Sequence, residues 1–409
     1  MELFKRENYL KLVRGFYQAT DIIKVITGVR RCGKSSLMQL IAEELRDSGV
    51  AEERIVFLNL DRREYRKIKT ADQLDELIAN LPRSGDPMYL FIDEVQNVNG
   101  FEEVINAFRE DGGISIFITG SNSYLLSGEL ATKLTGRYLE IELFPLTFDE
   151  YLEMKRFYGK PVNANLSAEL NRFILEGGFP RAIHFDDMAD KRSYTQSVVG
   201  EIFEKDIRRR VKIRNKEAFE AVRHFIINNF GATMSLNRLH EALVKSGMTI
   251  KRTTVSKYIQ VLIDAKVLYA CDRFDMKTKR AIQGERKYYL SDLSFYFCDN
   301  TDNRINFGPV LENLVYFYAR SQGNSVSVGR IGKLECDFIL RDREMDYAYV
   351  QVAYTIAQSR ETEDREYRPL EQIRDNYPKY LMTTDYLLQK RNGIRHVNLM
   401  DFMRGGERF

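Results

Sequence analysis

Eight residues near the start of the chain have the types and spacing of a phosphate cradle. The segment GVRRCGKS, residues 28–35, matches the pattern G-x-x-x-x-G-K-S/T and lies between an apolar run and a helix-like segment. Glycines let backbone N–H groups turn toward phosphate oxygens, a lysine reaches terminal phosphates, and a serine hydroxyl can bind Mg²⁺. The segment predicts a nucleotide site formed by Gly28, Val29, Arg30, Arg31, Cys32, Gly33, Lys34, Ser35 and Ser36.

Two adjacent acids follow another apolar run, in YLFIDEVQNV. Asp93 at the end of an expected strand can hold the metal together with Ser35, and Glu94 can polarise an attacking water. Acidic pairs after strands also occur as solvated turns. If both acids act, the site hydrolyses its nucleotide rather than only holding it, with Lys34 and Glu94 as catalytic residues.

A third strand-like run ends in polar residues, in FITGSNS. Thr119, Ser121 and Asn122 are expected at the carboxyl edge of the sheet, where ligands of open α/β folds bind. We predict that Asn122, with Ser121 as second choice, orients the water against the terminal phosphate. The alternative is a turn of the ordinary Gly-Ser-Asn kind.

The elements that would position these residues are short apolar runs separated by helix-like segments. Continuous apolar runs suit strands that are buried on both faces of a parallel sheet. The sequence therefore predicts an α/β domain over residues 1–150. Its five expected strands begin at Ile23, Ile55, Met88, Ile114 and Tyr138.

The remainder of the chain divides into three segments by pattern. Residues 151–215 are helical and predict a lid or connector. Residues 216–292 give three helices and a hairpin, which predicts a winged helix, and residues 293–409 predict a small mixed α/β domain. The fold class is thus a P-loop-type parallel sheet with three further modules.

The expected winged helix carries basic residues on one face of its last helix. Val255, Ile259, Leu262 and Ile263 form an apolar stripe, and the opposite face has Lys251, Arg252, Thr254 and Lys257. This arrangement predicts contact with duplex DNA, although winged helices also dock proteins. Further basic residues are Lys277, Lys279 and Arg280 at the wing tip and Arg208, Arg209, Arg210, Lys212 and Arg214 upstream.

The motifs GVRRCGKS, FIDE and ITGSNS together resemble P-loop ATPases of the AAA-like and STAND-related group of bacteria and archaea. LTGRYLEIELFPLTFDEYL and EGGFPRAI are similar to that family's Gly-Arg element and lid motif. The resemblance implies ATP with Mg²⁺, an arginine that senses the γ-phosphate at Arg137, and a proline that packs near the adenine at Pro180. Whether Arg137 would act in its own subunit or a neighbour's is left open, as is the oligomeric state.

The last segment is similar to the domain of unknown function that commonly follows such ATPases, a relative of the PD-(D/E)XK nuclease fold. Glu312, Asp337 and the run Gln351-Val352-Ala353 have the order of that fold's metal site. A working site of this kind needs a lysine after Gln351, and the chain has Ala353 there. We therefore expect a degenerate domain without nuclease activity, with residual metal binding at Glu312, Asp337 and Gln351 left open.

Composition limits the classes of protein to which the chain can belong. With 62 basic and 59 acidic residues in 409, the net charge of +3 predicts no global affinity for nucleic acid. Four scattered cysteines fit a reducing compartment, and no apolar run has the length of a membrane span. The sequence predicts a cytoplasmic protein whose partners are ATP or ADP and either DNA or a protein, and not a membrane.

Overall fold

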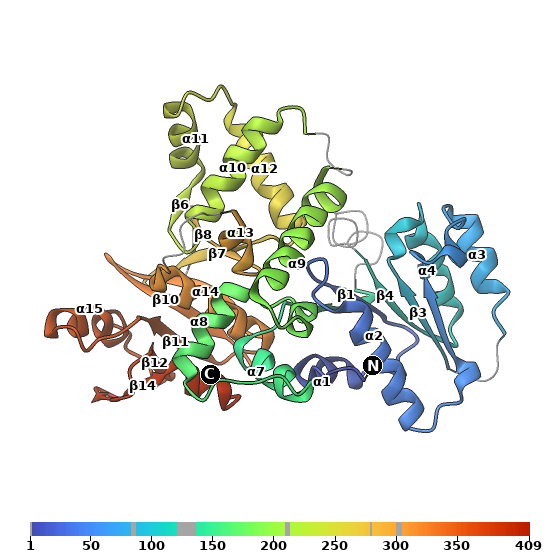
Figure 1. Cartoon of the computed structure of the whole chain (residues 1–409), viewed down its shortest axis with the longest axis horizontal. Helices are drawn as coiled ribbons and strands as arrows, with labels where there is room; N and C mark the ends of the chain where they lie inside the picture. Colours follow the sequence, from blue (N-terminus) through green and yellow to red (C-terminus); the bar gives the residue numbers. More distant parts are fainter. Residues whose placement is uncertain (1, 83–86, 121–135, 209–212, 279, 300–304) are drawn as a thin grey trace. The chain divides into compact units, whose positions relative to one another are not determined.

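The structure is a computed structural model, which describes residues 2–82, 87–120, 136–208, 213–278, 280–299 and 305–409 (Figure 1). The expected residues Ser121, Asn122, Arg209, Arg210, Lys212 and Lys279 lie outside these ranges. Contacts divide the chain into two compact units, Met1–Phe144 and Pro145–Phe409. No helix among the described residues is long and apolar enough to cross a membrane.

The first unit is built on a five-stranded parallel sheet, as the sequence predicts. Its strand order is β2-β3-β4-β1-β5, and every neighbouring pair is parallel. The strands are β1 (Ile23–Thr27), β2 (Ile55–Asn59), β3 (Met88–Asp93), β4 (Ile114–Thr119) and β5 (Tyr138–Glu142). β1, β3 and β4 are buried along their whole length, which explains their continuous apolar sequence.

Helices cover both faces of this sheet. α2 (Lys34–Asp47) lies on one face, and α3 (Ala71–Ala79) and α4 (Phe101–Asp111) lie on the other (Figure 1). A capping box fixes the start of α3, because the Thr70 side chain accepts from the N–H of Gln73 and the Gln73 side chain accepts in return. Leu74 and Ile78 of α3 then join the apolar core beneath the strands. A further helix, α1 (Glu7–Arg14), precedes β1.

One lysine lies inside the sheet. Lys24 of β1 is fully buried, and its Nζ donates to the carbonyl oxygens of Ala19 (2.6 Å) and Ile22 (3.1 Å) and to the Ser115 hydroxyl (2.7 Å). The ammonium also lies 4.6 Å from the centre of the Phe117 ring. Burial lowers the pKa of Lys24 to about 7, although the nearby Asp21 acts in the opposite direction.

Lys24 should make stability depend on pH. Around pH 8.5 the unfolded chain holds a proton on Lys24 that the folded chain lacks, so Lys24 should contribute a rise in the free energy of unfolding of about 1.3 kcal/mol per pH unit. Urea unfolding at several pH values should give the same slope in the wild type and in Lys11→Met, a variant of an exposed lysine. In Lys24→Met the slope should be smaller by that amount, and equal slopes would contradict the lowered pKa.

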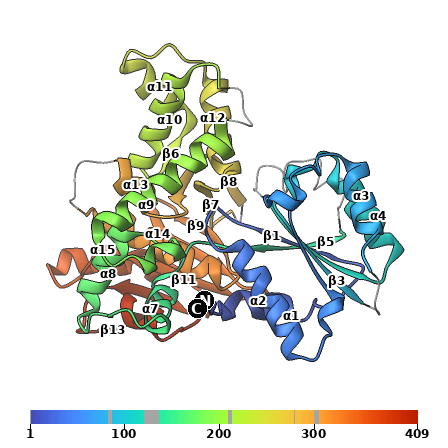
Figure 2. The same ribbon diagram turned by 45° about the vertical axis from the view of Figure 1, so that its right-hand side comes forward.

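The second unit begins with a helical segment. It contains α7 (Phe148–Phe157), α8 (Leu166–Glu176), the short 3₁₀ helix η4 (Pro180–His184) and α9 (Met188–Glu201), which continues into a π-helical turn, η5 (Ile202–Arg208). α10 (Lys216–Asn228), α11 (Leu236–Lys245) and α12 (Arg252–Asp264) follow, and Figure 2 shows them grouped above a β-hairpin. The hairpin consists of β7 (Leu268–Asp275) and β8 (Arg280–Leu290).

The hairpin is one part of a larger sheet, which the sequence reading did not foresee. β7 pairs in parallel with β9 (Ser325–Ile331) through the register pair Phe274 and Gly329, in addition to its antiparallel pairing with β8. The resulting nine-stranded sheet has the order β13-β14-β12-β11-β10-β9-β7-β8-β6 and crosses the domain boundary expected at residue 292. The hairpin is therefore built into the sheet of the C-terminal segment.

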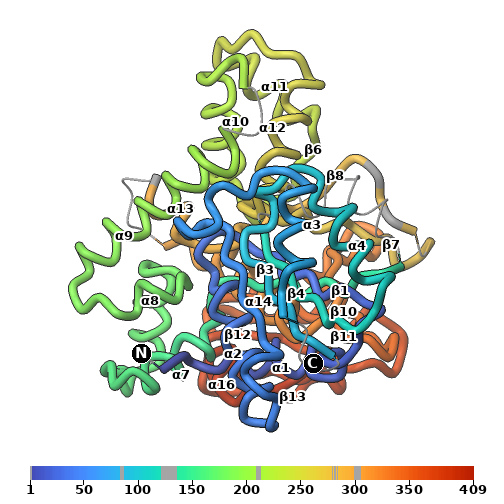
Figure 3. Tube along the Cα trace, turned by 90° about the vertical axis from the view of Figure 1, so that its right-hand side faces the viewer, coloured from blue at the N-terminus to red at the C-terminus, as the bar shows by residue number. Residues whose placement is uncertain are grey.

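The C-terminal segment supplies the other strands and further helices, which Figure 3 traces to the chain end. α14 (Phe307–Ser321) packs beside β8, β10 and β11, and α15 (Arg360–Glu371) packs beside β10, β11 and β12. Its strands are β10 (Leu334–Arg341), β11 (Tyr347–Val352), β12 (Lys379–Thr383), β13 (Lys390–Arg391) and β14 (Ile394–Asn398). The short β6 (Met234–Ser235), between α10 and α11, pairs with β8. The remaining helices are α13 (Ser294–Asp299) and α16 (Leu399–Arg404).

Candidate nucleotide site

Two glycines of the segment 28–36 are required by its backbone. Gly28 has φ +145°, and a Cβ placed on it would lie 2.1 Å from the carbonyl oxygen of Leu143. Gly33 has φ +107° and immediately precedes the first residue of α2. Residues with side chains rarely adopt such φ values, so both positions need glycine. The loop therefore follows β1 and leads into the N-terminus of α2, as the motif predicts.

Lys34 carries a buried positive charge at the centre of this loop. Its side chain is 8% exposed, and its Nζ donates to the carbonyl oxygens of Gly28 (2.9 Å) and Val29 (3.2 Å). Within the described ranges no carboxylate lies at ion-pair distance from it. A buried ammonium that has only carbonyl partners favours an additional anion, so the loop suits a phosphate.

Arg6, which sequence reasoning missed, holds the loop from its outer side. Nη1 of Arg6 donates to the carbonyl oxygens of Phe144 (2.7 Å) and Cys32 (3.3 Å). The guanidinium lies 4.6 Å from the centre of the Tyr9 ring, whose hydroxyl accepts from the N–H of Phe144. No local pattern marks Arg6, because its partners lie 26 and 138 residues away.

The side chain of Cys32 within the loop packs in the interior of the protein. Its side chain is fully buried, and burial raises the pKa of its thiol. Raised thiol pKa values disfavour the reactive thiolate. Arg30 is half-buried, and Arg31 is exposed with a left-handed backbone (φ 68°).

Asp93 lies buried at the carboxyl end of β3, between two polar residues of the neighbouring strands. Nδ2 of Asn59 donates to one carboxylate oxygen at 3.0 Å, and the hydroxyl of Thr119 donates to the other. Asn59 stands opposite Asp93 in the register of β2 and β3. Sequence reasoning singled out Thr119 but missed Asn59, although Asn59 also ends an apolar strand at this edge.

Glu94 turns away from the strand direction directly after Asp93. Its backbone is left-handed (φ 57°, ψ 46°), and its N–H donates to the Thr119 hydroxyl at 3.2 Å. Its carboxylate accepts from the side-chain amide of Gln96, whereas Asp93 is held by Asn59 and Thr119. A non-glycine residue in this conformation is uncommon and costs about 1 kcal/mol or more. The two adjacent acids thus have different surroundings.

These residues fit a divalent cation bound together with phosphate. Asp93 and the half-buried Ser35 offer oxygen ligands, which Mg²⁺ prefers. Asp93 already has an amide and a hydroxyl donor that orient its carboxylate, so it enters a site without rearrangement.

Arg137 does not lie where the resemblance implies for its own chain. It precedes β5, and its carbonyl oxygen accepts from the N–H of Ile23, the first residue of β1. Because β1 and β5 are parallel and the loop follows the last residue of β1, Arg137 lies at the opposite edge of the sheet, one strand length or roughly 15 Å away. Its guanidinium pairs with Glu110 at 3.0 Å. The structure therefore does not bring Arg137 to the loop of its own chain, and its role at the γ-phosphate stays a prediction.

Comparison with known sequences finds a family model and relatives that match this chain. A family model described as an AAA domain matches residues 20–152. An uncharacterized protein of Haemophilus influenzae is 33% identical over 98% of both chains, and the uncharacterized protein MJ1544 of Methanocaldococcus jannaschii is 33% identical over 74% of this chain and 67% of its own. The chain belongs to this family of AAA-domain proteins.

The fold comparison agrees for the AAA domain and leaves the rest open. The solved structure of the Walker-type ATPase PABY2304 of Pyrococcus abyssi has a TM-score of 0.51 at 15% identity, covering 72% of this chain and 95% of that one. A second family model, described as a domain of unknown function (DUF8612), matches residues 167–298. That match spans helices α8 to α12 and the hairpin, whereas the sequence reading expected such a domain in the last segment.

Pro180 belongs to the second unit, and its expected place near an adenine stays a prediction. It begins η4, two residues after the Gly177-Gly178 pair. The N–H of Gly178 donates to the Asp292 carboxylate at 2.6 Å, and its carbonyl oxygen accepts from the N–H of Leu146 at 2.7 Å. The segment around Gly178 is thus held between two distant segments of its own unit.

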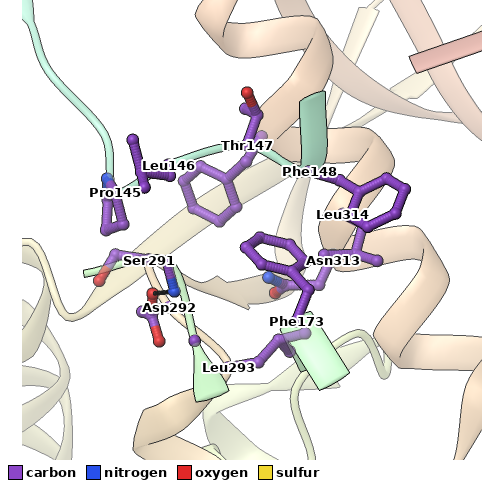
Figure 4. Close-up of a pocket in the computed structure, with 13 residues that line it drawn as sticks. Pro145, Leu146, Thr147, Phe148, Phe173, Ser291, Asp292, Leu293, Asn313 and Leu314 are labelled. Carbon is purple, nitrogen blue, oxygen red and sulfur yellow. Dashed lines mark hydrogen bonds between the residues drawn. The ribbon is translucent and has the colours of Figure 1, made fainter. Parts of the chain in front are cut away.

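A cavity adjoins this junction. Figure 4 shows Phe148 and Phe173 on one side and Ser291 and Asp292 on another. Asp292 is fully enclosed, and burial raises its pKa although the N–H groups of Gly178 and Ser294 both donate to it. Because Leu146 follows the end of the AAA unit by two residues, the junction fixes the chain where it enters the second unit.

Proposed function

We propose that the protein is a Mg²⁺-dependent ATPase whose nucleotide state controls the second unit. Gly28 to Ser36 bind the phosphates, with Lys34 at the terminal ones. Ser35 and Asp93 would hold Mg²⁺, which neutralises charge on the phosphates when bound. Glu94 accepts the proton of the attacking water. ATP is favoured over other nucleotides by the family resemblance.

The observation that carries this proposal is the hydrogen-bonded edge formed by β2, β3 and β4. Thr119 donates to Asp93 and accepts from the N–H of Glu94, so one hydroxyl holds the carboxylate of the first acid and the backbone of the second. The carboxylate of Glu94 accepts from the side-chain amide of Gln96 and so stands apart from the expected metal ligand Asp93. A carboxylate in that position can take up a proton without giving up a metal ligand.

For the second unit we propose a winged-helix contact with duplex DNA. Three basic side chains are exposed at the start of α12: Lys251 at its N-cap, and Arg252 and Lys257 in its first turns. They make no ion pair with any described residue, and Thr254 between them is half-buried. Val255, Ile259 and Leu262 are buried on the other face. Basic residues without acidic neighbours favour phosphate contacts.

A protein-binding scaffold with little turnover is the second candidate, and the hairpin favours it. β7 is paired with β9 as far as Asp275, and β8 begins again at Arg280, which is paired with Asp275. Upstream, Arg208 is already paired with Glu204. The division proposed here remains 1–150, 151–215, 216–292 and 293–409, with a degenerate PD-(D/E)XK-like last module.

Phosphate release from ATP, measured with and without duplex DNA at two salt concentrations, tests the proposal. The wild type should hydrolyse ATP with Mg²⁺, and Lys34→Met should abolish it. DNA affinity should fall steeply with salt, and a triple variant in which Lys251, Arg252 and Lys257 become Ser should reduce the slope of log K against log salt by about 3. The exposed Lys245→Ser in α11 is the control.

Two outcomes would contradict the proposal in different ways. ATP turnover that persists in Lys34→Met would show that the activity belongs to a contaminant or another site. Tight ATP binding with negligible turnover, or DNA binding whose salt slope does not change in the triple variant, would favour the scaffold.

A further inference from the structure

The ammonium of Lys287 lies among three carboxylates of the second unit. Lys287 belongs to β8 and is 4% exposed. Its Nζ lies 2.9 Å from Glu312 of α14, 3.0 Å from Glu335 of β10 and 3.9 Å from Asp337 of β10. Three acids from two elements thus surround one lysine from a third.

Neighbouring donors use most of the remaining carboxylate oxygens. The Tyr289 hydroxyl donates to the same Glu312 oxygen that binds Lys287, at 2.9 Å. Arg273 donates to the second oxygen of Glu335 at 2.9 Å. The N–H of Val352 donates to the second oxygen of Asp337 at 2.8 Å. The cluster is therefore hydrogen-bonded on several sides by the protein itself.

Two cations of the protein itself, Lys287 and Arg273, lie among the carboxylates of this cluster. Burial alone would lower the pKa of Lys287, but Glu312, Asp337 and Glu335 more than offset it, so the pKa is raised and the lysine stays charged. Burial and the charge of Glu312 raise the pKa of Asp337. Lys287 thus pairs with Glu312 and Glu335, and Arg273 bridges Glu335 and Glu285.

These positions coincide with those that the nuclease-like resemblance gives to a divalent metal, and they do not fit one. Gln351, the third expected ligand, accepts from the N–H of Asp337 at 3.3 Å and donates to Glu366 at 3.0 Å. A cation between Glu312 and Asp337 would meet the ammonium of Lys287 at contact distance. Lys287 already occupies oxygens of Glu312 and Glu335, so a metal bound there would have to displace its ammonium from them against charge repulsion.

We propose that Lys287 is the permanent cation of this cluster, so that the second unit holds no catalytic metal and uses these carboxylates to fix its hairpin to α14 and β10. The residue is in the hairpin, far in sequence from the motif that lacks its lysine at Ala353. The ion pairs act beside the β7–β9 pairing, and together they hold the hairpin at both strands. The helices α10 to α12 are thereby carried on a rigid base rather than on a mobile wing.

Thermal unfolding of the full nucleotide-free chain in EDTA and in Mn²⁺ tests this proposal. Lys287→Met leaves the buried Asp337 and the partly buried Glu312 without their cation, and the midpoint of the second unit should fall by about 10 °C in EDTA. Mn²⁺ should restore part of this loss, because the vacated carboxylates can bind it. The wild type and the control Lys277→Met, an exposed lysine of the same hairpin, should show neither the loss nor any difference from each other in Mn²⁺.

The proposal is wrong if Mn²⁺ raises the unfolding midpoint of the second unit by as much in the wild type as in Lys287→Met. If Lys287→Met does not fold, the double variant Lys287→Met/Glu312→Gln replaces it. That variant removes one charge of each sign, so its folding where the single variant fails would support the ion-pair role. If both remain unfolded, the charges are not what Lys287 contributes, and the proposal is wrong.

Nuclease activity gives an independent test of the same proposal. Supercoiled plasmid incubated with the wild-type chain and Mg²⁺ or Mn²⁺ should stay uncut. Metal-dependent cutting that is lost in both Lys287→Met and Asp337→Asn would show that Lys287 belongs to a working metal centre, and would overturn the proposal. Failure of the ATPase proposal would leave this result unaffected, because neither the unfolding assay nor the cleavage assay contains nucleotide.

Discussion

Glu94→Gln should lower ATP turnover by about 10² to 10⁴-fold while leaving ATP affinity within a few-fold of the wild type. The glutamine keeps the size of the side chain and its contact with Gln96 but cannot accept the proton of the attacking water. The phosphate loop is untouched, so the ground state should bind normally. Phosphate release under saturating ATP and calorimetric titration with ATP measure the two quantities.

Glu110→Gln is the matched control for this prediction. Glu110 lies at the opposite edge of the same sheet, where it pairs with Arg137 and Arg109. Its substitution should leave both turnover and affinity unchanged. If Glu94→Gln hydrolyses ATP as fast as the wild type, Glu94 is not the base. If it loses ATP binding as well, the residue acts on the nucleotide or on the fold of the loop.

The parts of the AAA domain that the sequence could predict are those encoded locally. Each strand is a continuous apolar run, and the motif around Lys34 contains its own glycines, so strands and loop could be placed from a few residues each. The carboxyl edge followed from chain direction alone, which brought Asp93 and Thr119 together. Asn59 obeys the same rule and could have been found by applying it to β2.

Arg137 shows what a motif match leaves open when the topology is unknown. The match gave its position along the chain but not the edge of the sheet at which that position lies. Because β5 runs parallel to β1, a residue that precedes β5 is separated from the loop by the length of the strand. Only the strand pairing contains that information.

Lys287 shows the same limit in the second unit. Sequence reasoning searched for the missing lysine beside Gln351, on the strand where the motif has it. The side chain that meets the carboxylates comes from β8, and it reaches them because β7 joins the sheet beside β9. Pairing between strands that are so far apart in the chain leaves no periodic signal in either one.

Gly178→Ala should destabilise the second unit by roughly 3 kcal/mol or more, which corresponds to a fall of about 6–12 °C in its unfolding midpoint. A Cβ on Gly178 would lie 2.5 Å from the carbonyl oxygen and 3.0 Å from the nitrogen of Leu146, and 3.2 Å from the Asp292 carboxylate. Backbone on one side and a buried acid on the other leave no flexible group to move aside. Calorimetry of the full chain measures the loss.

Gly200→Ala makes the same chemical change where space is open, so it separates the steric effect from the general effect of replacing glycine. Gly200 lies in α9, and a Cβ on it would have no described neighbour within 4 Å outside its own helix turn. Alanine is the better helix former by up to about 1 kcal/mol, so this variant should be equal to or more stable than the wild type. If Gly178→Ala unfolds at the same temperature as the wild type, the segment that begins at Pro145 can separate from the segment around Gly178. The Gly178–Leu146 and Gly178–Asp292 hydrogen bonds would then not be what holds the chain where it leaves the AAA domain.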